Sequence, residues 1–338
     1  MQGGLTEKNR RLVLATTLFA MADLSSARAR ARSAVLAAHG TNQYLTLYEG
    51  LQARRDISKS DGSSSLLHNI SEVIASAAYW RDESTAAASS SLNAQHHENA
   101  RKFCSERRKQ TLSTGGWCLN RMVSDKLFGE ERRVQTLNGG SSYRLPASHV
   151  PADKLLLLGI RTITDGLKHS VLDFGAGVGQ YGRELQGEGL RWRGFDGAGD
   201  VEEYTDGFVK YADLTIPLSI QPRADWVVSF EVGEHVPRKH ELMVVRNLHA
   251  HNKCGVLLSW ACCHSGHQHV NLRPNALVIE WFDQLGYYYD ARRTEAMRNP
   301  RLREQLRDNR THRVYGWFAT SVMLFVRRTP LRGCALVS

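Results

Sequence analysis

The sequence predicts an α/β fold in which strands alternate with helices around a mainly parallel sheet. Three observations support this prediction. From about residue 150 onward, short apolar runs alternate with segments of helical periodicity. A glycine-rich turn, residues 175–179, joins the first of these runs to a helix. The chain has 338 residues, of which 42% are hydrophobic and 23% charged, and this is the composition of a folded globular protein.

The predicted strands are short apolar runs, several of which end in or beside an acidic residue. We expect strands at 170–174, 190–195, 207–212, 225–230, 254–260, 287–291 and 316–326. We expect helices from the glycine turn through residue 185, around 238–251 and at 275–285. Because helices cross between parallel strands, both faces of the sheet should be covered, and a ligand should bind at the carboxyl ends of the strands.

The chain before this domain divides into two parts. Residues 1–40 contain a basic start and an apolar stretch, 12–22, that ends in Ala-Met-Ala, as a secretory signal does. The Arg- and Ser-rich stretch 25–32 is instead typical of an organelle transit peptide, and a surface helix is the alternative to both. The predicted location is therefore the secretory pathway or an organelle, or otherwise the cytoplasm. Residues 41–145 are predicted to be a helical and irregular extension, and 146–330 the main domain.

The charge, the apolar runs and the cysteines of the sequence limit the kinds of partner and environment that we expect. Forty-four Lys and Arg against 34 Asp and Glu give a formal charge of +10, which suits an acidic substrate or, as a weaker prediction, nucleic acid. No run of about 18 apolar residues is present, so no ordinary membrane-spanning helix is expected. Cys262 and Cys263 lie beside a predicted strand and are interpreted as buried free thiols. Cys104 and Cys118 could form a disulfide, and the sequence does not decide this.

The glycine turn carries the first chemical signal. Glycines between a strand and a helix let the backbone approach a ligand where a side chain would clash. Asp173 lies two residues before the first glycine, where it would repel a pyrophosphate but attract an ammonium group. Asp196 ends the next strand, about twenty residues after the turn, and can accept hydrogen bonds from both ribose hydroxyls. These acids favour a nucleoside ligand with a cationic group.

Four segments together resemble the class I S-adenosylmethionine-dependent methyltransferases. They are VLDFGAGVGQYG (171–182), GFD (194–196), ADL (212–214) and DWVVSFEVGEHVP (225–237). The resemblance implies a Rossmann-like, seven-stranded sheet whose last strand is antiparallel, and S-adenosyl-L-methionine as the cofactor. By matching positions, it implies that the methionine part is held by Asp173, Gly175, Gly177 and Gly179. It further implies that Asp196 holds the ribose, that Asp213 and Leu214 hold the adenine, and that Phe230 and Glu231 line the pocket wall.

Two further loops should meet at the same edge of the sheet. One carries Glu231, Glu234 and His235, and the other carries His264, His267 and His269. A histidine base could remove a proton from the methyl acceptor, and we favour His269, then His235, with His267 and Glu234 as further candidates. A divalent metal is the alternative, held by Glu231, Glu234, His235 and His267. A purely structural role for these side chains is the third interpretation.

The predicted acceptor is the oxygen or nitrogen of a small molecule, either sugar-like or acidic. The stretch HVNLRPNALVIEWFDQLGY (269–287) resembles small-molecule and sugar methyltransferases. The E-x-x-E-H pattern with a later H-x-H is similar to metal-dependent methyltransferases of small-RNA 3′ ends, so RNA ribose methylation is the alternative. A scaffold that binds the cofactor without turnover is the second alternative. Arginines between residues 292 and 313 could cover the entrance for an acidic substrate or form a solvated helix. Trp117, in Gly-Gly-Trp-Cys-Leu, belongs to a packed turn or a lid, and we favour the turn.

Overall fold

The computed structural model describes residues 83–106, 110–122, 124–125, 129–262, 266–306 and 313–334. The predicted targeting segment 1–40, His264 and Cys263 lie outside the described residues. Within the described ranges, no helix combines the length and the apolar character that crossing a membrane requires.

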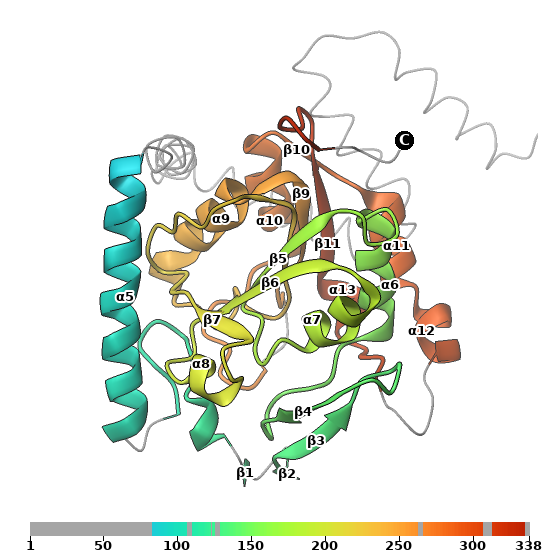
Figure 1. Cartoon of the computed structure of the whole chain (residues 1–338). Coiled ribbons are helices and arrows are strands. Elements are labelled where there is room, and N and C mark those ends of the chain that lie inside the picture. The colour runs from blue at the N-terminus through green and yellow to red at the C-terminus, as the bar shows by residue number, and fades with distance from the viewer. Residues whose placement is uncertain are drawn as a thin grey trace, which may run out of the picture. The chain divides into compact units, whose positions relative to one another are not determined.

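A seven-stranded sheet forms the centre of the domain (Figure 1). Its order is β10-β11-β9-β8-β5-β6-β7. Strand β11 runs antiparallel to both of its neighbours, and the other pairings are parallel. This confirms the predicted fold class, including the reversed last strand. The strands are β5 (Ser170–Phe174), β6 (Arg191–Asp196), β7 (Val209–Tyr211), β8 (Ala224–Ser229), β9 (Asn252–Ser259), β10 (Tyr287–Tyr289) and β11 (Val322–Arg327).

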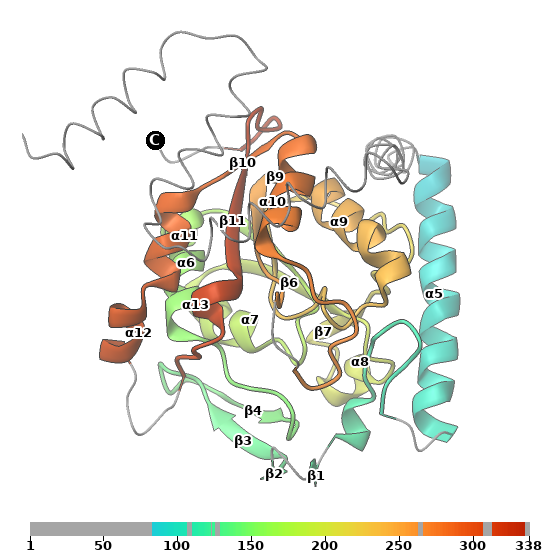
Figure 2. The ribbon, with the colours of Figure 1, turned by 180° about the vertical axis from the view of Figure 1, so that it is seen from behind.

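Two separate hydrophobic cores cover the two faces of the sheet. Alternation along β5 places Val171 in one core and Leu172 in the other, because successive side chains of a strand point to opposite faces. The first core includes residues of α6, and the second includes residues of α9 and α10. Figures 1 and 2 show the helices on both sides of the sheet. They are α6 (Lys154–Ile163), α7 (Gln180–Leu185), α8 (Val201–Tyr204), α9 (Glu241–Ala250), α10 (Asn275–Gln284), α11 (Ala291–Arg298), α12 (Pro300–Leu306) and α13 (Phe318–Ser321).

The last predicted strand is wrong in its first half. Residues 318–321 form the short helix α13, and β11 begins only at Val322. Val322 pairs with Ser259, the last residue of β9, and among the described residues beyond it only the N–H of Trp260 reaches back, to the carbonyl of Ser321 at 3.4 Å. Without a neighbour to accept its backbone hydrogen bonds, the preceding segment satisfies them locally as a helical turn.

The segment before the sheet contains more strand than the sequence predicts. A 24-residue helix, α5 (Glu83–Glu106), is followed by two small antiparallel pairs. They are β1 (Ser124–Asp125) with β2 (Gly129–Glu130), and β3 (Arg132–Gln135) with β4 (Ser142–Leu145). The β3–β4 strands are mostly exposed, with Val134, Tyr143 and Leu145 buried, so their weak apolar alternation gave little signal.

The cysteines that the structure describes are oxidised. Cys104 and Cys118 form the disulfide that their spacing allowed, and a second one joins Cys254 of β9 to Cys334. The interpretation of Cys262 as a buried free thiol is wrong, because Cys262 is half-buried and disulfide-bonded. Among the residues that the structure describes, no cysteine is free.

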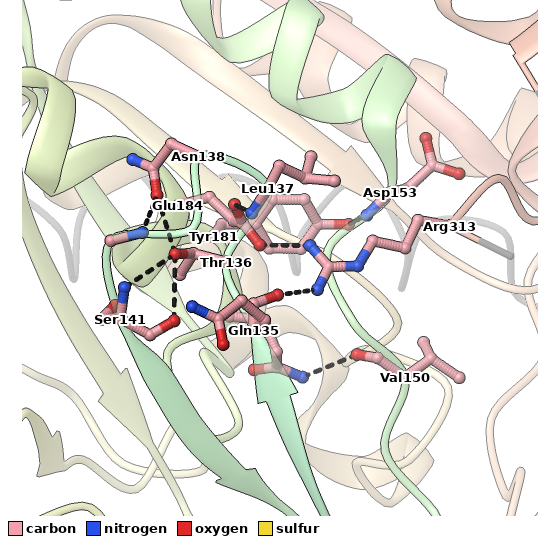
Figure 3. A network of polar contacts seen from close by, with 12 residues as sticks. Gln135, Thr136, Leu137, Asn138, Ser141, Val150, Asp153, Tyr181, Glu184 and Arg313 are labelled. Atoms are coloured by element: carbon pink, nitrogen blue, oxygen red, sulfur yellow. Dashed lines mark hydrogen bonds and ion pairs between the residues drawn. The ribbon is translucent and has the colours of Figure 1, made fainter. Parts of the chain in front are cut away.

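Three arginines of the basic segment between residues 292 and 313 are buried, so for these three neither a solvated helix nor an entrance cover applies. Arg298 donates to the carbonyl of Val322 at 2.7 Å, and Arg303 pairs with Asp153 at 2.9 Å. Arg313 pairs with Glu184 of α7 and donates to the carbonyl of Gln135 in β3 (Figure 3). These arginines therefore join the segment between β10 and β11 to the body of the domain, and they do not reach a substrate entrance.

The pair between Glu184 and Arg313 holds the β3–β4 hairpin against α7. Both side chains are buried, and the second carboxylate oxygen of Glu184 accepts a 2.8 Å bond from the backbone N–H of Leu137 (Figure 3). Removing the charge of one partner leaves the other ion buried without compensation, which is costly.

Glu184→Gln should therefore lower the free energy of unfolding by about 3–5 kcal/mol. Glu188→Gln is the matched control, because Glu188 pairs with Arg161 at the surface and its loss should cost about 0–1 kcal/mol. Urea denaturation of the three proteins measures the difference. Equal losses in the two variants would contradict a structural role for the buried pair.

Candidate functional site

The glycine turn after β5 bends around the edge of the sheet. Gly175 and Gly177 have φ angles of 76° and 56°, in the left-handed region that favours glycine. A Cβ on Gly175 would lie 2.1 Å from a methyl group of Val232. The backbone N–H groups of Gly175 and Ala176 donate to the carbonyl of Phe195 at 2.8 and 3.0 Å. The turn is thus fixed to β6 and leaves its inner side open toward a cavity.

Gly179 has a different place from the other two glycines. It does not line the cavity, and a Cβ there would lie 2.6 Å from the ring of Phe208. Its φ of 80° begins α7, so its role in this structure is to allow the turn and the close packing of the helix.

The two acids near the ends of β5 and β6 have raised pKa values. Asp173 is 1% exposed, and burial raises the pKa of its carboxyl to about 7, although Trp192 donates to it at 3.3 Å. Desolvation also raises the pKa of Asp196, to about 6, against two backbone N–H bonds that lower it. These bonds come from Gly177 and Ala198, each at 2.8 Å. Both acids would be stabilised in the ionised form by a cationic ligand.

A cavity of about 500 Å³ lies at the carboxyl ends of β5, β6, β8 and β9. It brings together most of the side chains and glycines that the sequence singled out. The predicted cofactor residues that line it are Asp173, Gly175, Gly177, Asp196, Asp213, Leu214, Phe230 and Glu231. Of the predicted catalytic residues, His235, His267 and His269 line it, whereas Glu234 is fully buried behind them.

Glu231 is held in a strained backbone conformation at the end of β8. Its φ is 56°, in the left-handed region that non-glycine residues rarely adopt. Its N–H donates to the hydroxyl oxygen of Ser259 at 2.8 Å, and that hydroxyl donates to the Glu231 carboxylate at 2.7 Å. Burial raises the pKa of Glu231. Burial and then the charge of Glu231 raise the pKa of Glu234 well above its usual range.

The two loops that carry the candidate catalytic residues are joined through their backbones. The carbonyl of Glu234 accepts from the N–H groups of Val270 and Asn271 at 2.8 and 2.9 Å. The rings of His235 and His269 lie 5.1 Å apart, centre to centre. Burial and then the neighbouring His269 lower the pKa of His235 to about 4, so its imidazole is neutral near pH 7.

Trp117 forms part of the cavity wall and belongs to a packed turn as well. Its ring lies edge-on to His235 at 5.1 Å and to His149 at 5.3 Å, measured between ring centroids. The turn is anchored by the Cys104–Cys118 disulfide and by Asp200, whose carboxylate accepts from the N–H groups of Leu119 and Asn120 at 2.7 and 2.8 Å. The structure therefore confirms the packed turn, and it shows that this turn also lines the cavity. A Cβ on Gly116 would lie 2.0 Å from the carbonyl oxygen of Gly197, so the turn needs glycine there.

Sequence reasoning missed His149. It lines the cavity from the segment before α6, and burial followed by the neighbouring His235 lowers its pKa to about 4. Nothing in the stretch Ser-His-Val-Pro marks it as a site residue, since it follows no strand of the main sheet. The segment that carries it follows β4, and Arg132 of β3 donates to its carbonyl at 3.1 Å.

Three side chains could hold a metal ion. One ligand atom each from Glu234, His235 and His269 lies within 4.8 Å of the others. The predicted metal ligands were Glu231, Glu234, His235 and His267. In the structure His269 takes the place of His267, and the Glu231 carboxylate is hydrogen-bonded to Ser259 instead of belonging to the set. Glu234 is fully buried, and a carboxylate and two imidazoles suit zinc or a similar divalent ion.

No Lys or Arg side chain balances the carboxylates in the described lining of the cavity. The whole chain nevertheless has a formal charge of +10. A buried anion beside the carboxylates would therefore lack a partner.

No family model matches the chain, and no curated protein matches it. Among solved structures, it is similar to magnesium protoporphyrin IX methyltransferase from Synechocystis PCC 6803 with bound SAM: 16% identity, 51% of this chain and 77% of that chain covered, TM-score 0.36. It is similar to Burkholderia thailandensis 1,6-didemethyltoxoflavin-N1-methyltransferase with bound S-adenosylhomocysteine, at 14% identity over 52% of this chain and 79% of that one, TM-score 0.35. The glycopeptide N-methyltransferase MtfA with SAM is 12% identical, with 54% and 98% covered and a TM-score of 0.38. These likenesses do not identify the chain, and its own cavity residues carry the proposal below.

Proposed function

We propose that the protein is an S-adenosylmethionine-dependent methyltransferase. The observation that carries this proposal is the pairing of a glycine turn with two carboxylates, Asp173 and Asp196, in a cavity whose described lining has no Lys or Arg. A pyrophosphate would be repelled there, whereas the ammonium and sulfonium groups of S-adenosylmethionine match the negative charge. Asp173 would meet the amino group, and Asp196 the ribose hydroxyls.

The proposed acceptor is the oxygen or nitrogen of a small, uncharged or cationic molecule. This proposal departs from the expectation of an acidic substrate, because Arg298, Arg303 and Arg313 are buried away from the cavity, and the described cavity wall supplies acids and imidazoles. A sugar-like acceptor still fits, since its hydroxyls can bond to neutral imidazoles. RNA fits less well, because phosphate contacts normally come from Lys and Arg.

His269 is the favoured proton acceptor. Methylation of a hydroxyl or ammonium group requires a proton to leave, and the methyl group moves by in-line displacement, so the acceptor must be held in line with the sulfonium. With a pKa near 4, His235 is a weak base at neutral pH. His269 lines the cavity, and an oxygen of Glu234 lies within 4.8 Å of one of its ring nitrogens.

We further propose that the protein works in an oxidising compartment. Two disulfides, of which Cys254–Cys334 spans 80 residues, and the oxidised Cys262 support this location, since such bonds are rare in reducing compartments. The signal-like pattern in residues 12–22 agrees with it.

Asp196→Ala should weaken S-adenosylhomocysteine binding at least about tenfold, because each lost hydrogen bond to a charged group is worth roughly 1.5–3 kcal/mol. Isothermal titration calorimetry measures the affinity, and Glu188→Ala at the surface is the control that should bind as the unaltered protein does. Unchanged affinity in Asp196→Ala would refute the ribose assignment. No binding by the unaltered protein would refute the proposed cofactor.

His269→Ala should lower methyl transfer by about 10²-fold or more while cofactor affinity stays nearly constant. Transfer of label from S-adenosylmethionine into an extracted metabolite pool measures turnover and also separates an enzyme from a cofactor-binding scaffold. If a chelator abolishes transfer and a divalent metal restores it, His269 acts as a metal ligand with Glu234 and His235. If neither change affects transfer, both chemical roles are refuted.

Cysteines 104, 118, 254 and 334 should resist alkylation in denatured protein until a reductant is added. Reduction should also lower the free energy of unfolding, by about 3 kcal/mol for the short loop and about 4–5 kcal/mol for the long one. Mass spectrometry after alkylation and urea denaturation with and without reductant measure the two effects. Full alkylation of protein from its native source without reductant would contradict the proposed location.

A further inference from the structure

Helix α5 lies beside β7, at the edge of the sheet where the adenine loop begins (Figures 1 and 2). The adenine loop is defined here as residues 212–215, which follow β7. The side chains that α5 turns toward the domain recur at helical spacing, so they form one stripe along the helix. They are Ser89, Leu92, Asn93, His96, His97, Ala100 and Cys104.

This stripe is unusually polar for the inner face of a helix. Apolar residues normally fill such a face, because their burial stabilises the contact. Here Ser89 donates to the carbonyl of Pro217 at 2.9 Å, and the ring of His97 stacks on Tyr211 with centroids 4.4 Å apart. Directional polar contacts fix the position of what they touch, which apolar contacts do less strictly.

Asn93 holds the backbone on both sides of Ala212. Its side-chain N–H donates to the carbonyl of Tyr211 at 3.2 Å, and its side-chain oxygen accepts from the N–H of Asp213 at 3.0 Å. The amide therefore completes, from another part of the chain, the hydrogen bonds that a further strand would have made to β7.

His96 holds the carboxylate of Asp213. The two are 2.7 Å apart, from Nδ1 to Oδ2, and Asp213 is 2% exposed. An ionised carboxylate only accepts hydrogen bonds, so the imidazole donates from Nδ1. The other oxygen, Oδ1, accepts from the N–H and the hydroxyl of Thr215, at 2.8 and 2.6 Å.

One acceptor position of Asp213 remains for a ligand. A carboxylate offers about four such positions, and His96 and Thr215 occupy three. Asp213 lines the cavity, so the remaining position is available from that side.

We propose that His96 and Asn93 are positioning residues for adenine recognition: they hold Asp213 so that its remaining acceptor takes a hydrogen from the 6-amino group. This inference rests on the proposed function. It makes a helix that precedes the methyltransferase domain in the chain a part of the cofactor site.

The proposal predicts discrimination between a 6-amino and a 6-oxo purine. S-adenosylhomocysteine offers a donor to Asp213, whereas S-inosylhomocysteine offers an oxygen that the carboxylate repels. The unaltered protein should bind the first at least about tenfold more tightly than the second. In His96→Ala the carboxylate of Asp213 loses its hydrogen bond from Nδ1 of the imidazole, so the ratio of the two affinities should fall toward one.

Two variants separate positioning from mere stability. Ser89→Ala removes another hydrogen bond of the same helix, to Pro217, and should leave the ratio unchanged. His96→Asn keeps a donor near the position of Nδ1 and should restore most of the ratio. Calorimetry with both ligands on the four full-length proteins gives the affinities.

The outcomes are distinct. Loss of discrimination in His96→Ala, with Ser89→Ala and His96→Asn close to the unaltered protein, supports the proposal. A ratio that is unchanged in His96→Ala, a ratio that falls equally in Ser89→Ala, or an unaltered protein that binds both ligands equally overturns it. If the unaltered protein binds neither ligand, the proposed function itself fails.

Discussion

The carboxylate of Asp196 joins two of the loops that form the cavity. One oxygen accepts from Gly177 in the turn after β5, and the other from Ala198 in the loop after β6. Four residues later, the carboxylate of Asp200 accepts from two N–H groups of the turn that carries Trp117. Asp196, at the end of β6, and Asp200, in the loop after it, therefore position three parts of the cavity wall that are distant in sequence.

Specific polar contacts supplement apolar packing where α5 and the β3–β4 hairpin meet the rest of the domain. Helix α5 contacts the adenine loop through Asn93 and His96, and the β3–β4 hairpin contacts α7 through Arg313 and Glu184. Such contacts add less net stability than apolar burial, because each buried polar group must first lose its water. They are more demanding in geometry, however, and so they fix the register of each element on the domain.

The sequence predicts the sheet and the acids at its edge well because these features are local. Strand β5 is found at its predicted bounds, and Asp173 and Asp196 follow from their place before and after the glycine turn. The walls added by other segments are not local. His149 reaches the cavity from the segment after β4, and His96 meets Asp213 across 117 residues. The first half of the strand predicted at 316–326 was wrong for a related reason, since the pairing of this segment with β9 stops where β9 ends.

The acids at the cavity also couple ligand binding to protons. With a pKa of about 7, Asp173 is partly protonated at neutral pH. The pKa of Asp196 is also raised, to about 6. A cationic ligand favours the ionised carboxylates, so its binding lowers both pKa values and releases protons. Apparent affinity should then rise with pH until both acids are ionised in the free protein, and level off above about 7. The same raised values mean that the ligand-free fold loses stability as pH rises from the unfolded pKa of about 4. The molecule thus depends most on its ligand for stability in the alkaline part of this range.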